Sequence, residues 1–284
     1  MTAPRLSVTD HRRDRAGLRY VYPVVSRRAG GVSVGINLNP NQACNWRCIY
    51  CQVPNLQRGS APPVDLVLLE QELRAFLQEV LHGDFMQSCV PEGMRRLNDI
   101  ALSGDGEPTS AAEFLQVVEL IGRARQEVGV PERVKLVLIT NGSLLHRSDV
   151  QAGLRHMSAL NGEVWFKLDR AGTAGMVAVN DTRTTMDKVR ANLQIAIAAC
   201  PLWLQTCWFA TDGLPPGADE EQSYIDFVGE LLLSGSRPRG VLLYTLARPS
   251  LQPEAARLSA LPVESLEAFA TRIRALGIEV KVSG

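Results

Sequence analysis

Segments with the pattern of β-strands alternate with segments that have the pattern of α-helices along most of this 284-residue chain. The strand-like segments are short, apolar and rich in β-branched residues, and they fall at residues 33–39, 99–104, 134–140, 163–168, 202–209, 240–246 and 278–282. Helical periodicity of apolar side chains is clearest at residues 64–81, 110–128, 185–200 and 263–276. Strand, helix and strand repeated about six times predicts a parallel sheet with helices outside it.

The domain organisation follows from the same alternation. Composition does not change along the repeats, so we predict a single catalytic domain over residues 32–284. Residues 1–31 are rich in arginine, and we expect them to form an N-terminal extension. In a parallel sheet, ligands bind outside the carboxyl ends of the strands. Polar residues that directly follow a strand are therefore the candidates for a functional site.

Charge and hydropathy restrict the setting in which the protein works. The chain carries 30 basic and 30 acidic residues, so the molecule as a whole does not attract nucleic acid or an anionic membrane over long range. No apolar run reaches the roughly 20 residues of a membrane-spanning helix, and the first residues lack the apolar core of a secretory signal. We therefore predict a cytoplasmic protein, in which clustered cysteines indicate metal binding or catalysis rather than disulfides.

Three of the six cysteines, Cys44, Cys48 and Cys51, follow the first strand within "NPNQACNWRCIYCQ". Soft thiolates select iron–sulfur clusters, zinc or copper(I). Structural zinc normally has four ligands, often as two separated pairs, whereas three cysteines on a four-iron cluster leave one iron open to a small molecule. The pattern favours an open cluster, and a zinc knuckle is the alternative.

A glycine-rich acidic motif, "LSGDGEPTS", follows the second strand. Gly104 and Gly106 allow a tight turn and a close approach of the backbone. Glu107 can accept hydrogen bonds from an ammonium group, and Pro108 restricts the loop. An ordinary strand-to-helix turn explains this motif equally well when it is taken alone.

Taken together, the two motifs resemble those of the radical S-adenosylmethionine (radical SAM) superfamily, in particular its wybutosine-type iron–sulfur oxidoreductase branch. The similarity spans about residues 21–284 and includes "LITNGSLL", "VWFKLD" and "YTLARPS" in the family's order. It implies a partial (β/α)6 TIM-like barrel with parallel strands and helices outside. It also implies a [4Fe–4S] cluster and S-adenosylmethionine as cofactors.

The resemblance assigns roles to individual residues. Cys44, Cys48 and Cys51 match the cluster ligands, and Tyr50 matches the aromatic position near the adenine. The family's "GGEP" loop, which holds the methionine ammonium, corresponds to Gly104, Asp105, Gly106, Glu107 and Pro108, with Asp105 in place of the second glycine. Asn141 would reach the ribose hydroxyls, and Lys167 would lie near the methionine carboxylate. A turn residue and a strand-end ion pair are the respective alternatives for these last two.

Residues on the later strands are weaker candidates. Gln205, Thr206, Tyr244 and Arg248 can line a substrate pocket, although an amide such as that of Gln205 is as often satisfied within a core. The remaining cysteines are Cys89, Cys200 and Cys207. They are isolated along the chain and are predicted to be small buried residues rather than ligands of a second cluster.

The resemblance implies a radical SAM enzyme of oxidoreductase or transferase type. Such an enzyme cleaves S-adenosylmethionine reductively to methionine and a 5′-deoxyadenosyl radical, which abstracts hydrogen from a small-molecule or peptide substrate. Its partner would be an electron donor such as a flavodoxin or ferredoxin. Two alternatives stay open. Basic stretches at residues 11–15 and 26–28 agree with an RNA substrate, and a non-catalytic metal-binding module would need no substrate.

Overall fold

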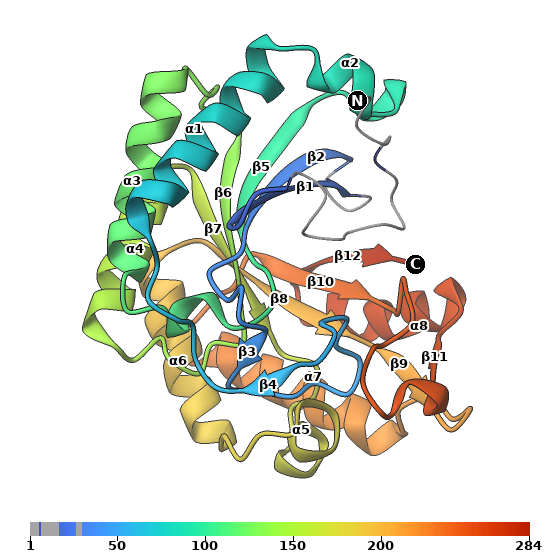
Figure 1. Ribbon diagram of the computed structural model, residues 1–284. Helices are drawn as coiled ribbons and strands as arrows, with labels where there is room; N and C mark the ends of the chain where they lie inside the picture. Colours follow the sequence, from blue (N-terminus) through green and yellow to red (C-terminus); the bar gives the residue numbers. More distant parts are fainter. Residues whose placement is uncertain (1–5, 7–16, 27–29) are drawn as a thin grey trace.

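An eight-stranded sheet forms the centre of the computed structural model, which describes residues 6, 17–26 and 30–284. The strands are ordered β1-β2-β5-β6-β7-β8-β10-β12. Their bounds are Val21–Ser26 (β1), Gly31–Ile36 (β2), Leu97–Leu102 (β5), Lys135–Thr140 (β6), Gly162–Lys167 (β7), Leu202–Cys207 (β8), Gly240–Tyr244 (β10) and Glu279–Ser283 (β12). β1 is antiparallel to β2, and all the other neighbouring pairs are parallel. The sheet curves into a barrel that stays open between β1 and β12 (Figure 1).

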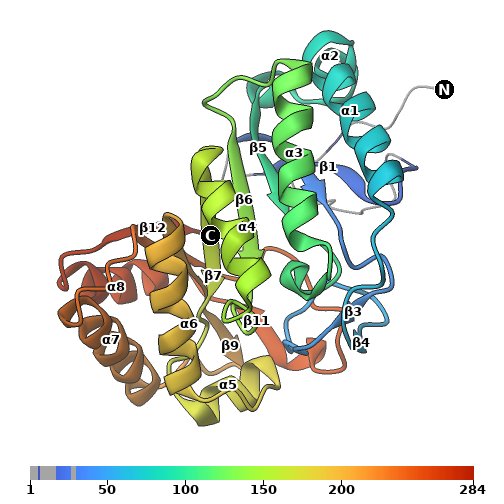
Figure 2. The ribbon, with the colours of Figure 1, turned by 90° about the vertical axis from the view of Figure 1, so that its left-hand side faces the viewer.

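Helices follow the parallel strands and cover the outside of the sheet (Figure 2). They are α1 (Leu66–His82), α2 (Phe85–Cys89), α3 (Phe114–Val128), α4 (Ser148–Ala159), α5 (Thr173–Asn180), α6 (Met186–Ala199), α7 (Ala218–Leu233) and α8 (Val263–Arg274). Shorter strands are β3 (Ala43–Cys44), β4 (Gln57–Arg58), β9 (Phe209–Thr211) and β11 (Leu258–Ala260). Six helical connections link seven parallel strands, so the predicted partial (β/α)6 barrel with outer helices is confirmed.

Alternation of side chains gives the sheet two different faces. On β6, Leu136 and Leu138 are fully buried in the apolar core that lies between the sheet and the helices. Lys135 and Val137, which alternate with them, line the inside of the barrel. The interior therefore carries polar and charged groups, and these are available to a ligand.

β1 is a strand that the sequence analysis did not predict. A carboxylate from α1 fixes its start: Glu72 accepts hydrogen bonds from the backbone N–H groups of Arg19 and Tyr20, each at 2.8 Å, and of Val21 at 3.3 Å. Residues 21–26 then pair with β2 along their whole length. Part of the predicted extension thus forms one edge of the sheet.

Some sequence-based predictions concern residues that the structure does not describe. The basic stretch at 11–15 and most of the one at 26–28 lie outside the described residues. The division of the chain at residue 31 likewise stays a prediction, because residues 1–5, 7–16 and 27–29 are not described. Within the described part of the chain, none of the helices has the length and hydropathy needed to cross a bilayer.

Candidate functional site

The polar segments that follow the first four parallel strands meet at the carboxyl end of the barrel. Asn141, directly after β6, donates from Nδ2 to Oδ1 of Asn45 in the cysteine-containing loop at 2.8 Å. Tyr50 in the same loop donates from its hydroxyl to Oδ2 of Asp169 after β7 at 2.6 Å. These long-range hydrogen bonds confirm that the segments singled out in the sequence converge on one region.

The three clustered cysteines are half-buried free thiols in the loop after β2. The backbone N–H of Cys51 donates to the carbonyl of Cys48 at 2.9 Å, which turns the chain back on itself. Burial raises the pKa of Cys44 to about 12 and that of Cys48 to about 11. A soft cation that binds here must therefore displace protons from the thiols.

The donor set of the cysteine loop is three soft thiols. An iron–sulfur cluster is held by thiolates that bind different irons, so these residues are of the kind that fits such a cluster. Across residues 6, 17–26 and 30–284, no three His, Cys, Asp or Glu side chains are grouped as ligands of one metal ion.

α5 holds the cysteine loop from one side. The Nδ2 atom of Asn180, the last residue of α5, lies 3.3 Å from Sγ of Cys48 and 2.7 Å from Oδ2 of Asp169, and it donates to both. The loop backbone also bonds to this helix end, with the N–H of Ile49 donating to the carbonyl of Val179 at 2.9 Å. Asn180 is 1% exposed. The sequence analysis missed this residue because nothing in its local pattern distinguishes it from other helix-terminal asparagines.

An ion-pair cluster fastens the same loop from the outside. Arg47 binds Glu254 through both terminal nitrogens, at 2.8 and 3.1 Å, and donates from Nε to Asp181 at 3.0 Å. Hydrogen bonds from Arg47 lower the pKa of both carboxyl groups. Arg58 pairs with Asp181 as well, at 2.8 Å. The loop is therefore tied to α5 and to the chain after β10.

Both glycines of the "GDGEP" motif are needed because other protein atoms occupy the space that a Cβ would fill. A Cβ on Gly104, whose φ is +153°, would lie 2.3 Å from Oδ1 of Asn37. A Cβ on Gly106 would lie 2.0 Å from the carbonyl oxygen of Ala43. Asp105 accepts from Nδ2 of Asn37 at 2.6 Å. These glycines thus let the motif pack closely against the cysteine loop and the segment before it.

Glu107 is 2% exposed and accepts four hydrogen bonds within the protein. Its Oε1 accepts from the backbone N–H (3.2 Å) and the hydroxyl (2.5 Å) of Thr109 and from the hydroxyl of Thr140 at 2.6 Å. Its Oε2 accepts from the N–H of Asn141 at 2.7 Å. Burial raises the pKa of this carboxyl, and the hydrogen bonds partly offset the shift. A carboxylate offers about four lone-pair positions, and these four hydrogen bonds fill them. Because the donors come from Thr109 after β5 and from Thr140 and Asn141 at the end of β6, Glu107 holds the loops after these two strands in position. Pro108, also buried, begins a short 3₁₀ turn.

Lys167, at the end of β7, lies against Tyr50. Its Nζ is 2.8 Å from the tyrosine hydroxyl, to which it donates, and that hydroxyl donates in turn to Asp169. Burial pulls the pKa of Lys167 down, but the negative charge that Tyr244 and Asp169 can carry outweighs it, so the net shift is upward. Burial likewise raises the pKa of Tyr50. The structure thus brings both predicted residues into one hydrogen-bonded chain.

The remaining site residues predicted from the sequence lie partly beside the cysteine loop and partly away from it. Asn141, 5% exposed, bonds Asn45 and also accepts from Ser143, which agrees with the turn role left open in the sequence. Tyr244 packs on the small apolar cluster formed by Ile49, Tyr50, Val179, Cys207 and Phe209. Thr206 faces the helices and bonds the hydroxyl of Tyr224 at 2.7 Å. Gln205 is 2% exposed, and its Oε1 has no hydrogen-bond partner among the described residues.

The three remaining cysteines are buried, as predicted. Cys89, Cys200 and Cys207 are 4%, 3% and 0% exposed. Cys207 nevertheless belongs to the same apolar cluster as Tyr50, against which Cys48 packs. Its position at the end of β8, far from the other cysteines in sequence, concealed this proximity.

Several solved structures share this arrangement of strands and helices at low sequence identity. A radical SAM methyltransferase from Sphaerobacter thermophilus matches with a TM-score of 0.58 and 13% identity, over 93% of this chain and 68% of its own. A spore photoproduct lyase mutant matches with a TM-score of 0.59 and 11% identity, over 93% and 80%. Streptococcus suis SuiB, solved with S-adenosylmethionine bound, gives 0.54 and 10%, over 91% and 49%. The chain therefore has the radical SAM partial-barrel fold, which confirms the resemblance at the level of the fold.

Curated relatives match over about half of the chain. A UPF0026 protein of Methanocaldococcus jannaschii is 28% identical over 160 residues, which are 52% of this chain and 43% of that protein. A GTP 3′,8-cyclase of Campylobacter lari is 28% identical over 140 residues, 47% and 37%. A protein of Brachyspira hyodysenteriae named GTPase Obg is 26% identical over 132 residues, 46% and 17%. Each alignment thus spans less than half of the relative's length. No protein-family model matches the chain.

Proposed function

We propose that this protein is a radical SAM enzyme of oxidoreductase or transferase type. The observation that carries the proposal is the set of three free, half-buried thiols, Cys44, Cys48 and Cys51, at the carboxyl end of an open parallel barrel. Three soft ligands on one loop fit a [4Fe–4S] cluster with one iron left for S-adenosylmethionine. That cluster, when reduced by a donor such as a flavodoxin or ferredoxin, would supply the electron that yields methionine and a 5′-deoxyadenosyl radical able to abstract hydrogen from a small-molecule or peptide substrate.

The protein's own contribution is to orient the bound groups and to exclude water. Asn180 donates a hydrogen bond to Cys48 and so favours the thiolate form of this ligand. Lys167 supplies a half-buried positive charge beside Tyr50, and this charge suits the carboxylate end of S-adenosylmethionine. Glu107 keeps the backbone of residues 104–108 and the start of the loop after β6 in a fixed relative position. Fixed groups of this kind lower the reorganisation that a reaction requires.

The test is anaerobic reconstitution with iron and sulfide, followed by measurement of 5′-deoxyadenosine from S-adenosylmethionine and a reductant. The wild-type protein should be brown, absorb broadly near ~400 nm and form the nucleoside. Cys48→Ala should lose both the absorbance and the product. Cys200→Ala is the matched control, since Cys200 is equally a free thiol but is buried against the outer helices.

The outcomes separate the competing functions. Zinc in place of iron, or product formation that survives Cys48→Ala, would contradict the radical SAM assignment and leave the non-catalytic metal-binding module. An RNA substrate would appear as salt-dependent RNA binding, because phosphate contacts release counterions. The basic stretch at residues 11–15 and most of the one at 26–28 lie outside the described residues.

A further inference from the structure

A hydrogen-bond donor from α5 lies against one of the three sulfurs of the cysteine loop. The Nδ2 atom of Asn180, a residue that is 1% exposed, donates to Sγ of Cys48 at 3.3 Å. Cys44 makes a different contact, because its own S–H donates to Oδ1 of Asn45 at 4.0 Å. A thiol gives up its proton when it binds a metal. The contact of Cys44 is therefore lost on binding, whereas the bond from Asn180 to Cys48 is retained.

The main chain holds the end of α5 against Cys48. The N–H of Arg47 donates to the carbonyl of Asn180 at 3.2 Å. The N–H of Ile49 donates to the carbonyl of Val179 at 2.9 Å. These two bonds lie on either side of Cys48 and do not involve the side chain of Asn180. A change of that side chain alone therefore leaves the cysteine loop attached to the helix.

Asp169 decides which way the amide of Asn180 faces. Its Oδ2 accepts from Nδ2 of Asn180 at 2.7 Å and from the hydroxyl of Tyr50 at 2.6 Å. Lys167 donates to the same hydroxyl, so the proton of Tyr50 points to Asp169, which acts as an acceptor. An acceptor has to face the NH₂ group of an amide rather than its oxygen. One N–H bond of Asn180 thus points to Asp169 and the other to Cys48.

A hydrogen bond to a ligand sulfur changes how readily a cluster is reduced. Reduction adds negative charge to the cluster and its sulfurs, and hydrogen bonds to the sulfurs are among the factors that set the reduction potential. Hydrogen bonds are stronger when the acceptor is more highly charged. The N–H of Asn180 therefore stabilises the reduced cluster more than the oxidised one, and this difference raises the reduction potential.

We infer, resting on the proposed function, that Asn180 raises the reduction potential of the cluster through its hydrogen bond to Cys48. Asp169 is the positioning residue that keeps the N–H of Asn180 directed at the sulfur. The cluster is then easier for a one-electron donor to reduce.

A purely structural role of Asn180 predicts the opposite sign. A looser cysteine loop admits water, and water favours the more highly charged, reduced form of the cluster. Loosening therefore raises the potential, whereas loss of the N–H donor lowers it. The sign of the change separates the two explanations.

The test is a redox titration of the reconstituted cluster without S-adenosylmethionine, followed by the absorbance near ~400 nm. Asn180→Leu removes the donor and keeps a side chain of similar size. At a fixed applied potential, the ratio of reduced to oxidised cluster should fall about tenfold, which is a midpoint lowered by about 59 mV for a one-electron couple. Asn192→Leu is the matched control and should leave the midpoint unchanged, since Asn192 is a buried asparagine of α6 that donates to the carbonyl of Gly142.

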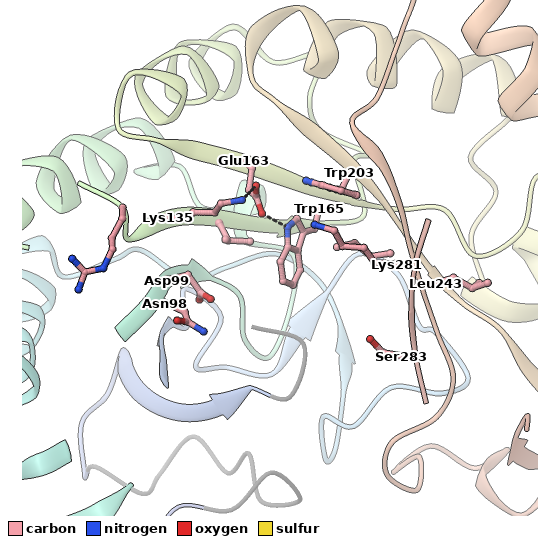
Figure 3. Close-up of a pocket in the computed structure, with 12 residues that line it drawn as sticks. Asn98, Asp99, Lys135, Glu163, Trp165, Trp203, Leu243, Lys281 and Ser283 are labelled. Carbon is pink, nitrogen blue, oxygen red and sulfur yellow. Dashed lines mark hydrogen bonds and ion pairs between the residues drawn. The ribbon is translucent and has the colours of Figure 1, made fainter. Parts of the chain in front are cut away.

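Asn180→Asp tests the inference even if Asn180→Leu does not fold, because it keeps the shape of the side chain and removes the N–H. Its added negative charge should lower the midpoint at least as far. Lys135→Gln is its control, since it changes the net charge by the same amount. Lys135 begins β6 and lines a cavity of about 270 Å³ (Figure 3). It lies roughly 16 Å along the strand from the carboxyl end, a distance over which exposed charges are largely screened, so this variant should leave the midpoint nearly unchanged.

The outcomes are distinct from those that test the proposed function. A midpoint that is unchanged or raised in a folded Asn180 variant would overturn the inference. Loss of the cluster from both Asn180 variants would overturn it as well, because Asn180 would then be needed for assembly of the cluster rather than for its potential. Failure of the proposed function appears earlier, as wild-type protein that takes up no iron and sulfide.

Discussion

Replacement of Glu107 by alanine should destabilise the protein strongly, even without cofactors. The change removes the acceptor of two backbone N–H groups, those of Thr109 and Asn141, at a site where Glu107 is 2% exposed. Each buried donor left unpaired costs about 1–3 kcal/mol, so the loss amounts to about 2–6 kcal/mol before any cavity is counted. The hydroxyls of Thr109 and Thr140 lose the same acceptor, so this range counts the backbone donors alone. This loss is a large part of the 5–15 kcal/mol typical of folded domains.

Urea denaturation of the metal-free protein measures this loss directly, with the free energy of unfolding obtained by linear extrapolation. Glu107→Gln should cost less, about 1–3 kcal/mol, because the amide keeps the shape and one acceptor. Glu119→Ala is the control, since Glu119 is 40% exposed and lies 3.9 Å from its partner His156. If Glu107→Ala lowered the free energy of unfolding no more than this surface change, the positioning role assigned to Glu107 would be wrong.

Three further predictions concern the cysteine loop and the barrel interior. Cys207→Ala should keep the iron and sulfide content of the reconstituted protein, and loss of the cluster would reveal a fourth protein ligand. The ion pairs of Arg47 lower the pKa of Asp181 and Glu254, so their stabilisation is present above about pH 4.5 and is lost as pH falls through the lowered values. The difference in melting temperature between wild type and Arg47→Met should therefore be larger at pH 6 than at pH 3, and an equal difference would refute this. Gln205→Met should not lower stability, because it removes a buried acceptor, Oε1, that has no hydrogen-bond partner among the described residues; a large loss of stability would mean that the amide is satisfied in the protein.

The strand and helix pattern was readable from local sequence because each element carries its own periodicity. All seven predicted strand segments appear in the sheet within a few residues of the expected bounds. β1 escaped notice for a physical reason: its start depends on the carboxylate of Glu72, about fifty residues later in the chain. Pro23 within it also weakens a strand pattern, and proline is tolerated there because β1 is an edge strand.

The candidate site was readable from the chain only in part. The spacing of Cys44, Cys48 and Cys51 and the neighbouring glycine-rich motif point to one end of a parallel sheet, because chain order places residues that follow parallel strands at the same edge. Contacts between distant segments are different in kind, since local pattern does not encode them. Only the folded structure shows that Asn180 donates to Cys48 and that Glu107 accepts hydrogen bonds from residues of another strand end. It also leaves Oε1 of Gln205 without a hydrogen-bond partner among the described residues.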